Sequence, residues 1–97
     1  MSLPVVWTSP TRAQLTDLYD YILQDNPRAA AGQLELIIDG ASSLAEFPEM
    51  GRPGRRSGTR ELVVPGTPYI VVYRIKMASI EVLAVMHGAR RWPRSFS

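Results

Sequence analysis

Apolar residues recur with two different periods along this chain of 97 residues. Before residue 48 they return every three or four positions, which is the spacing of one face of an α-helix. After residue 59 they form short runs rich in valine, isoleucine and tyrosine, which are typical of β-strands. The pattern therefore predicts helices in the first half of the chain and a sheet in the second half.

A short strand and a first helix are predicted before residue 26. The apolar run 3–7 is expected to be the strand. Ser9 is expected to be the N-cap of the helix and Pro10 its first residue, because the N–H that proline lacks would have no partner there. The helix should extend for about 15 residues along its apolar stripe. That stripe consists of Leu15, Leu18, Tyr19 and Ile22.

A second helix is predicted directly after the first. Asn26 is expected to be its N-cap and Pro27 its first residue, and the helix should end at Glu46 or Phe47. The very short link makes the two helices antiparallel. Gly40 lies inside the second helix and costs about 1 kcal/mol relative to alanine, so we expect close packing against the first helix there. The apolar stripe consists of Ala30, Leu34, Ile37, Ala41 and Leu44.

The second half begins with an irregular basic segment and continues with strands. Residues 48–58 contain three glycines, two prolines and three arginines without any period, which predicts a loop. Strands are predicted at residues 60–64, 69–75 and 80–86, with a turn at Pro65-Gly66 between the first two. The apolar run 69–75 is expected to be a central strand with both faces largely covered.

These elements predict a single α+β domain over residues 1–97. The order is strand, helix, helix, strand, strand, strand, so an antiparallel helical hairpin packs on one face of a small, mainly antiparallel sheet. The other face is expected to be more open. Strand alternation places Ile70, Val72, Arg74 and Lys76 on that open face.

Charge is distributed unevenly along the chain. Residues 1–50 carry two arginines and seven acidic residues, a net charge of −5, whereas residues 51–97 carry nine basic and two acidic residues, a net charge of +7. Such a split predicts a surface that meets an anionic partner, which is nucleic acid, phosphate or an acidic protein segment. A merely solvated basic surface is the alternative.

Composition excludes several other classes of function. The chain has no cysteine, so neither disulfides nor thiol catalysis is available, and with a single histidine we expect no metal site and no cofactor. No apolar run approaches the roughly 20 residues that a membrane helix needs. A cytoplasmic protein without a membrane anchor is therefore expected.

Candidate functional side chains lie on the predicted strands. Arg60 and Arg74 are candidates for bidentate binding of phosphate or carboxylate, with an ion pair to Glu61 or Glu81 as the alternative. His87 is a candidate general acid or base, with a hydrogen bond to the backbone as the alternative. Because their strands are neighbours in a meander, we expect several of these side chains to converge.

The aromatic residues divide into two groups. Trp7, Tyr21 and Tyr73 are expected to lie in the core. Trp92 and Phe96 lie in a basic tail, where they would either stack on a base or a partner helix or simply anchor the tail.

Several segments together resemble the RelE/ParE superfamily of bacterial toxins, the toxic halves of type II toxin–antitoxin modules. They are DLYDYI, NPRAA, LAEFPEMGRPG, GTRELVV, PYIVVYRI and VLAVMHGARRWP, and they extend from Trp7 to Pro93. The resemblance implies the same fold that the periodicity predicts, a helical hairpin on a small antiparallel sheet.

The superfamily has two functional branches. RelE-like members cleave messenger RNA on the ribosome, and here the resemblance would assign that chemistry to Arg60, Glu61, Arg74 and His87. ParE-like members inhibit DNA gyrase by binding. The GTREL and HGAR segments resemble the ParE-like branch more, and the tail has no tyrosine after Tyr73. The resemblance therefore implies a gyrase inhibitor without catalysis. An RNA endoribonuclease is the alternative, and an inactive toxin-like interaction module is the second.

The resemblance also implies partners. A cognate antitoxin would hold the toxin silent in a hetero-oligomer, and the toxin would act in growth inhibition and plasmid stabilisation. The basic half is the expected landing site for an acidic antitoxin segment or for the target. The residues predicted to bind there are Arg52, Arg55, Arg56, Arg60, Arg74, Arg90, Arg91 and Trp92.

Overall fold

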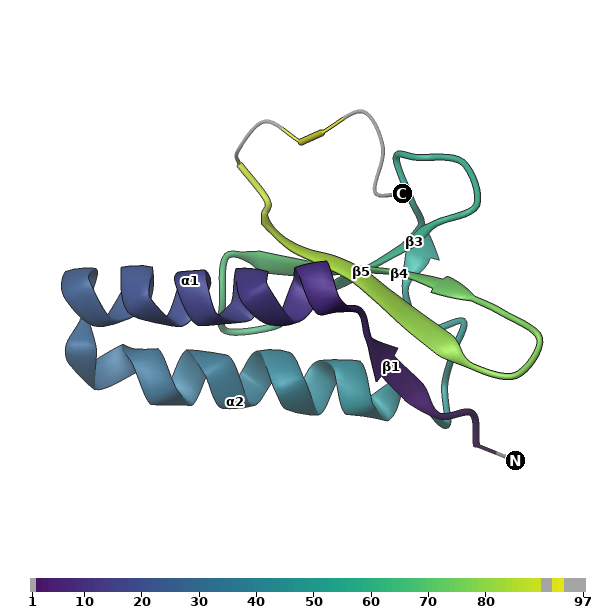
Figure 1. The fold of residues 1–97 in the computed structure, drawn as a ribbon, viewed down its shortest axis with the longest axis horizontal. Helices are drawn as coiled ribbons and strands as arrows, with labels where there is room; N and C mark the ends of the chain where they lie inside the picture. The colour runs from purple at the N-terminus through teal and green to yellow at the C-terminus, as the bar shows by residue number, and fades with distance from the viewer. Residues whose placement is uncertain (1, 90–91, 94–97) are drawn as a thin grey trace.

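The computed structural model describes residues 2–89 and 92–93. A helical hairpin forms one layer, and a five-stranded sheet forms the other (Figure 1). The observed order confirms the predicted α+β fold and adds one strand. The elements are β1 (Val5–Trp7), α1 (Ser9–Asp25), α2 (Pro27–Ser43), β2 (Arg52–Pro53), β3 (Arg60–Val63), β4 (Tyr69–Ile75) and β5 (Ile80–His87).

The strands lie in the order β1-β5-β4-β3-β2. β1 pairs parallel with β5, and the other pairs are antiparallel, so the sheet is mainly antiparallel as predicted. The additional strand is β2, which lies inside the segment predicted to be a loop and pairs with the start of β3. A two-residue strand that contains a proline has no periodicity of its own, so only its partner strand reveals it.

The helix boundaries correct the predicted caps. Thr8, not Ser9, precedes the first helical residue of α1, with an extended backbone at φ −64° and ψ 155°. Its hydroxyl bonds the Thr11 hydroxyl at 2.7 Å and the Val82 carbonyl at 2.9 Å, which holds the helix start on β5. Asn26 occupies the N-cap position of α2, as predicted, but its side chain makes no capping hydrogen bond.

α2 ends at Ser43, three or four residues before the predicted end at Glu46 or Phe47. The N–H groups of Leu44 and Ala45 bond carbonyls three residues earlier, so the chain leaves the α-helix through a tighter 3₁₀-like turn. The expected role of Gly40 is also wrong, because a side chain there would meet Leu62 and Val64 at 3.6–3.9 Å rather than α1. Gly40 therefore faces β3 and the residue that follows it.

The main core lies between the hairpin and the sheet. Four of the five residues of the predicted α2 stripe, Ala30, Ile37, Ala41 and Leu44, are fully buried, and Leu34 is half-buried. The four buried residues pack with residues of the inner sheet face, including Val71, Tyr73, Ile80 and Val82. Tyr73 lies in the core as predicted and Trp7 packs against it, but Tyr21 is 50% exposed. Tyr21 lies next to Ile22, off the apolar stripe of α1.

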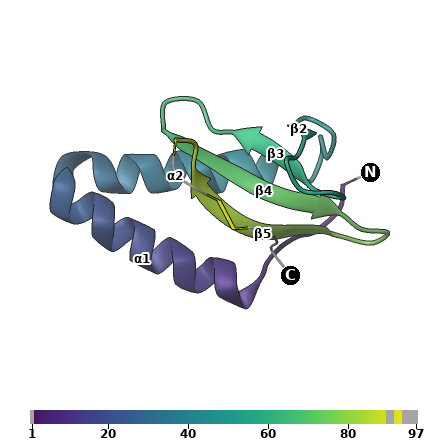
Figure 2. The same cartoon turned by 90° about the horizontal axis from the view of Figure 1, so that it is seen from above.

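The outer face of the sheet, which lies away from the helices, is not open along its centre. Ile70, Val72 and Ala84 are at most 5% exposed and form a second apolar cluster with Trp92. Figures 1 and 2 show residues 92–93 returning over this side of the sheet. The prediction of an open face was wrong here because the chain covers its own apolar strand with a distant tryptophan.

Polar side chains of α1 close the edge of β5 beyond β1. The Thr11 hydroxyl bonds the Val82 carbonyl at 3.0 Å. The Gln14 amide donates to the Val85 carbonyl at 2.7 Å and accepts from the Val85 N–H at 2.9 Å. One glutamine thus makes both hydrogen bonds that a neighbouring strand would otherwise make, which protects an exposed sheet edge.

The first prediction concerns this edge. Gln14→Ala leaves the Val85 N–H and carbonyl without partners, so the free energy of unfolding should fall by about 1–3 kcal/mol. Gln24→Ala, at an exposed position of the same helix, should change it by no more than about 0.5 kcal/mol. Urea unfolding of both variants is the measurement. Equal losses would contradict the role of Gln14.

A cross-strand ion pair joins the end of β4 to the start of β5. Arg74 Nε lies 2.7 Å from Glu81 Oε1, and Lys76 Nζ lies 3.8 Å from Glu81 Oε2. The hydrogen bond from Arg74 lowers the pKa of Glu81 below its ordinary value, burial opposes this, and the charges of Lys76 and Arg74 add to the lowering. Arg74 thus has the intramolecular partner that the alternative predicted, and 42% of its side chain stays exposed.

The second prediction follows from the sign of that shift. A lowered pKa in the folded state means that the pair stabilises the protein above the ordinary glutamate pKa and that this stability is lost as pH falls through the lowered pKa. Glu81→Gln should therefore flatten the acid side of the melting temperature's pH profile. Glu35→Gln, at an exposed position on α2, is the control and should leave the profile unchanged. Identical flattening in both variants would show that the pair contributes nothing specific.

Candidate functional site

The segment 48–59, here called the arginine loop, is held at its base by a buried tyrosine. The Tyr73 hydroxyl donates to the Pro48 carbonyl at 2.6 Å and accepts the Gly51 N–H at 3.0 Å. A side chain at Gly51 would begin 2.6 Å from that hydroxyl, so this close approach requires glycine. The loop is therefore anchored to the centre of the sheet.

Arg60 reinforces the same anchor. Its guanidinium donates to the Gly51 carbonyl at 3.1 Å and 2.6 Å and to the Glu49 carbonyl at 3.1 Å. These bonds use donors that bidentate recognition of a phosphate would need. The geometry gives Arg60 a part in shaping the loop.

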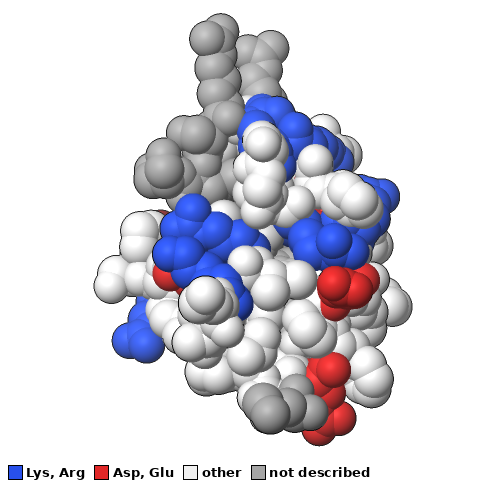
Figure 3. Space-filling model, turned by 90° about the vertical axis from the view of Figure 1, so that its right-hand side faces the viewer, with Lys and Arg blue, Asp and Glu red and all other residues white. Residues whose placement is uncertain are grey.

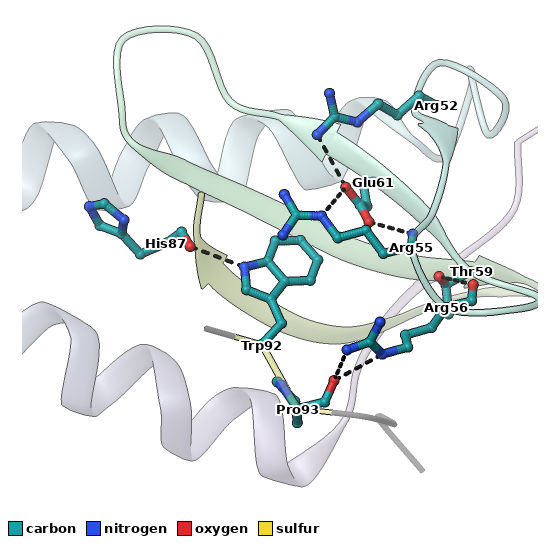
Figure 4. Close-up of polar contacts among 8 residues, drawn as sticks. All are labelled: Arg52, Arg55, Arg56, Thr59, Glu61, His87, Trp92 and Pro93. Atoms are coloured by element: carbon teal, nitrogen blue, oxygen red, sulfur yellow. Dashed lines mark hydrogen bonds and ion pairs between the residues drawn. The ribbon is translucent and has the colours of Figure 1, made fainter. Parts of the chain in front are cut away.

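Glu61 is the centre of the arginine loop (Figure 4). Its side chain is only 1% exposed although it carries a carboxyl group. Oε2 accepts the backbone N–H of Arg55 at 2.7 Å. Oε1 lies 3.2 Å from Arg52 Nη2 and 3.7 Å from Arg55 Nε. A single buried carboxylate thus holds two arginines and a turn of the backbone.

Trp92 joins the arginine loop to the C-terminal segment. The Arg55 guanidinium carbon lies 3.7 Å from the centre of the indole ring, a cation–π contact. The indole N–H donates to the His87 carbonyl at 3.1 Å, and the Arg56 guanidinium donates to the Pro93 carbonyl at 2.9 Å and 2.7 Å. Trp92 was predicted either to stack on a partner or to anchor the tail, and these contacts show the anchoring role.

His87 is bonded locally. Its Nδ1 accepts the Ala89 N–H at 3.1 Å, and its ring meets Tyr69 edge-on with 5.6 Å between ring centres. It also borders a cavity of about 270 Å³ between α1 and the end of β5, where Asp17 and Tyr21 form part of the wall. His87 therefore makes the backbone hydrogen bond that was the alternative to a catalytic role.

The side chains proposed for ribonuclease chemistry are not brought together. Arg74 pairs opposite Glu81 at one end of β4, whereas His87 pairs opposite Tyr69 at the other end. The five residue steps from Tyr69 to Arg74 separate the two ends by roughly 17 Å at about 3.3 Å per step. Arg60 and Glu61 are occupied by the loop. Strand adjacency alone was thus an insufficient guide, because it does not say at which end of a strand a residue lies.

Four accessible basic side chains gather at one end of the molecule, whereas the exposed Arg12 and Arg28 lie on the helices. Figure 3 shows lysine and arginine side chains over the end where the arginine loop and the turn between β4 and β5 lie. The exposed fractions of these side chains are 54% for Arg52, 41% for Arg55, 42% for Arg74 and 50% for Lys76. Two predicted binding residues, Arg90 and Arg91, lie outside the described residues. This surface is the candidate binding site.

Two residues important to the site were not singled out for their observed roles. The sequence predicts Glu61 as a proton carrier or an ion-pair partner, and only the structure shows its central position in the arginine loop. Its signal in the sequence is that it is the only acidic residue between Arg52 and Arg74. The contact of Arg56 with Pro93 had no sequence signal, since the two residues lie 37 positions apart.

Two further findings limit what the site contains. Among residues 2–89 and 92–93, no three histidine or acidic side chains lie together in a way that would hold a metal ion. In the same part of the chain, neither helix combines the length and the hydrophobicity required to cross a membrane.

Comparisons with known proteins agree with the fold. The chain is 43% identical over 88 residues to the candidate toxin Y4kP of Sinorhizobium fredii, covering 91% of each chain. It is 37% identical over 86 residues to the toxin RelE2 of Caulobacter vibrioides, covering 89% of this chain and 96% of the relative. Both relatives are named as toxins, one of them after the RelE branch.

Two solved structures are similar as well. A chain of the chromosomal ParDE toxin–antitoxin system of P. aeruginosa superposes with a TM-score of 0.80 at 24% identity, over 89% of this chain and 96% of that one. A chain of the RelBE2 toxin–antitoxin complex of Mycobacterium tuberculosis superposes with a TM-score of 0.62 at 26% identity, over 90% and 99%. Both support the two-layer fold.

A family model matches nearly the whole chain. It describes the ParE toxin of the type II toxin–antitoxin system parDE and covers residues 5–92. The match extends from β1 to the tryptophan that covers the outer sheet face. The chain therefore belongs to the ParE toxin family of type II toxin–antitoxin systems.

Proposed function

We propose that this protein is a ParE-like toxin that binds and inhibits DNA gyrase in the bacterial cytoplasm. In this role it arrests growth, serves plasmid stabilisation and is silenced by a cognate antitoxin. The ParE family model over residues 5–92 supports the toxin branch. The exposed basic side chains around Arg52 and Arg74 support inhibition by binding, which needs an accessible surface.

One observation favours binding over catalysis. Cleavage of RNA needs a base, an acid and a cation gathered around a single phosphate. Here Arg74 and His87 lie at opposite ends of β4 and β5, and Glu61 is buried under two arginines. This separation is the main support for a toxin that acts through a surface.

The antitoxin is the second proposed partner. The solved relatives come from a ParDE system and from a RelBE2 toxin–antitoxin complex, so proteins of this fold do assemble with antitoxins. An acidic antitoxin segment would be attracted to the basic end of this molecule. We therefore propose a hetero-oligomer in which the antitoxin covers part of the arginine loop and the outer sheet face.

The third prediction tests the target. The purified full-length chain should inhibit DNA supercoiling by gyrase, and the protein encoded by the neighbouring gene should restore the activity. A topoisomerase that relaxes DNA without gyrase is the control and should be unaffected. Full supercoiling in the presence of excess toxin would contradict the proposal.

The alternative is a ribosome-dependent endoribonuclease, and it is favoured by relatives that carry the RelE name. The fourth prediction is that primer extension on translated message shows no new cleavage ends when the toxin is present. New ends that disappear with Arg74→Ala but persist with Arg12→Ala, at an exposed position on α1, would establish the ribonuclease instead.

A third possibility is an inactive interaction module. Expression of the chain without its antitoxin distinguishes it, because a toxin stops growth and an inactive module does not. Growth arrest is the outcome we expect.

A further inference from the structure

The two exposed arginines of the loop share one buried anchor. Arg52 and Arg55 both contact Oε1 of Glu61, while the other oxygen is occupied by the backbone of Arg55. Each guanidinium has five N–H donors, and one carboxylate oxygen satisfies only a few of them. Side-chain exposures of 54% and 41% leave a large part of each arginine accessible to a partner.

Side-chain and backbone contacts restrain the arginine loop around Arg55. The Arg55 guanidinium lies between Glu61 and the face of Trp92. The Gly54 N–H donates to the Thr59 carbonyl at 2.8 Å, and the Thr59 hydroxyl donates to the Arg56 carbonyl at 2.6 Å. A free arginine loses much rotamer freedom when it binds an anion, and these contacts have already removed part of that freedom.

We propose that Glu61 is a positioning residue that holds Arg52 and Arg55 as a preformed binding site for the carboxylates of an acidic protein segment. The inference rests on the proposed function, in which the antitoxin supplies that segment. Glu61 itself does not touch the partner. It acts by orienting the two guanidinium groups, which matters because arginine recognises carboxylates through a planar, directional pair of donors.

The surface fits an acidic polypeptide better than a nucleic acid strand. Proteins that bind single strands without sequence preference offer aromatic faces on which bases stack. Trp92 is 8% exposed, and the Arg55 guanidinium covers its ring. Val63 lies two residues after Glu61 on β3, so it shares that sheet face, and at 49% exposure it would contact an apolar residue of a peptide.

The direction in which Glu61→Gln changes binding affinity distinguishes positioning of the arginines from attraction by net charge. Glu61→Gln removes a negative charge, so attraction by net charge alone would strengthen the binding of an acidic partner. Positioning requires the opposite, because a neutral amide no longer holds two guanidinium groups. The exposed Asp39→Asn on α2 raises the net charge by the same amount without touching the loop.

The experiment measures fluorescence anisotropy of a labelled oligoglutamate peptide, at low salt, with the full-length protein. Glu61→Gln should weaken binding about tenfold, the effect of releasing two arginine side chains. Asp39→Asn should leave binding equal or slightly tighter. Equal or tighter binding by Glu61→Gln would overturn the proposal, as would an absence of measurable binding by the unsubstituted protein.

A second variant covers the case in which Glu61→Gln fails to fold, which its circular dichroism spectrum would reveal. Arg52→Gln leaves Glu61 bound to Arg55 and should weaken binding of the oligoglutamate peptide by about three- to tenfold. Arg12→Gln on α1 removes the same charge and should have a smaller effect. Equal losses in these two variants would mean that only net charge matters and would overturn the site.

A final comparison identifies the class of partner. A labelled single-stranded oligonucleotide should bind more weakly than the oligoglutamate peptide, and Glu61→Gln should leave its binding equal or slightly tighter, because only the net charge changes for it. Tighter binding of the oligonucleotide would overturn the assignment to a protein segment. Neither measurement involves gyrase, so failure of the supercoiling test and failure of this site are distinguishable.

Discussion

The structure depends on one constraint, which is that β4 is apolar on both of its faces. Its first five residues, from Tyr69 to Tyr73, are all buried. Burial of apolar surface on both sides of a strand requires two covering layers. The helical hairpin supplies the inner layer. On the outer side the cover includes Trp92, which packs on Ile70, Val72 and Ala84.

The packing of Trp92 on the outer face of the sheet explains why an arginine side chain lies there. Trp92 approaches from the C-terminal segment, and the arginine loop approaches from the other side and places the Arg55 guanidinium over the indole. Guanidinium groups suit this position because they stack on an aromatic face and still present donors to water. Glu61 offsets part of their charge beneath the surface. The cover of the outer sheet face and the proposed docking surface therefore use the same residues.

Local patterns predicted the regular elements well and the irregular ones poorly. The bounds of β4 and the α2 stripe follow from side-chain periodicity, which packing against a layer enforces. β2 and the early end of α2 were missed, because each depends on bonds to a partner or on a local tightening that has no period. The expected convergence of Arg74 and His87 failed for a similar reason, since register decides which end of a strand each residue occupies.

The sequence by itself determined the two-layer α+β fold, the family and the basic character of the second half. These properties follow from apolar spacing, from motif order and from composition, none of which depends on distant contacts. Only the tertiary structure decided which arginines are engaged, because their partners lie 9 positions away for Arg52 and 37 positions away for Arg56. It also decided that Glu61 is buried among cations. Long-range contacts of this kind arise only when the sheet and its outer cover come together.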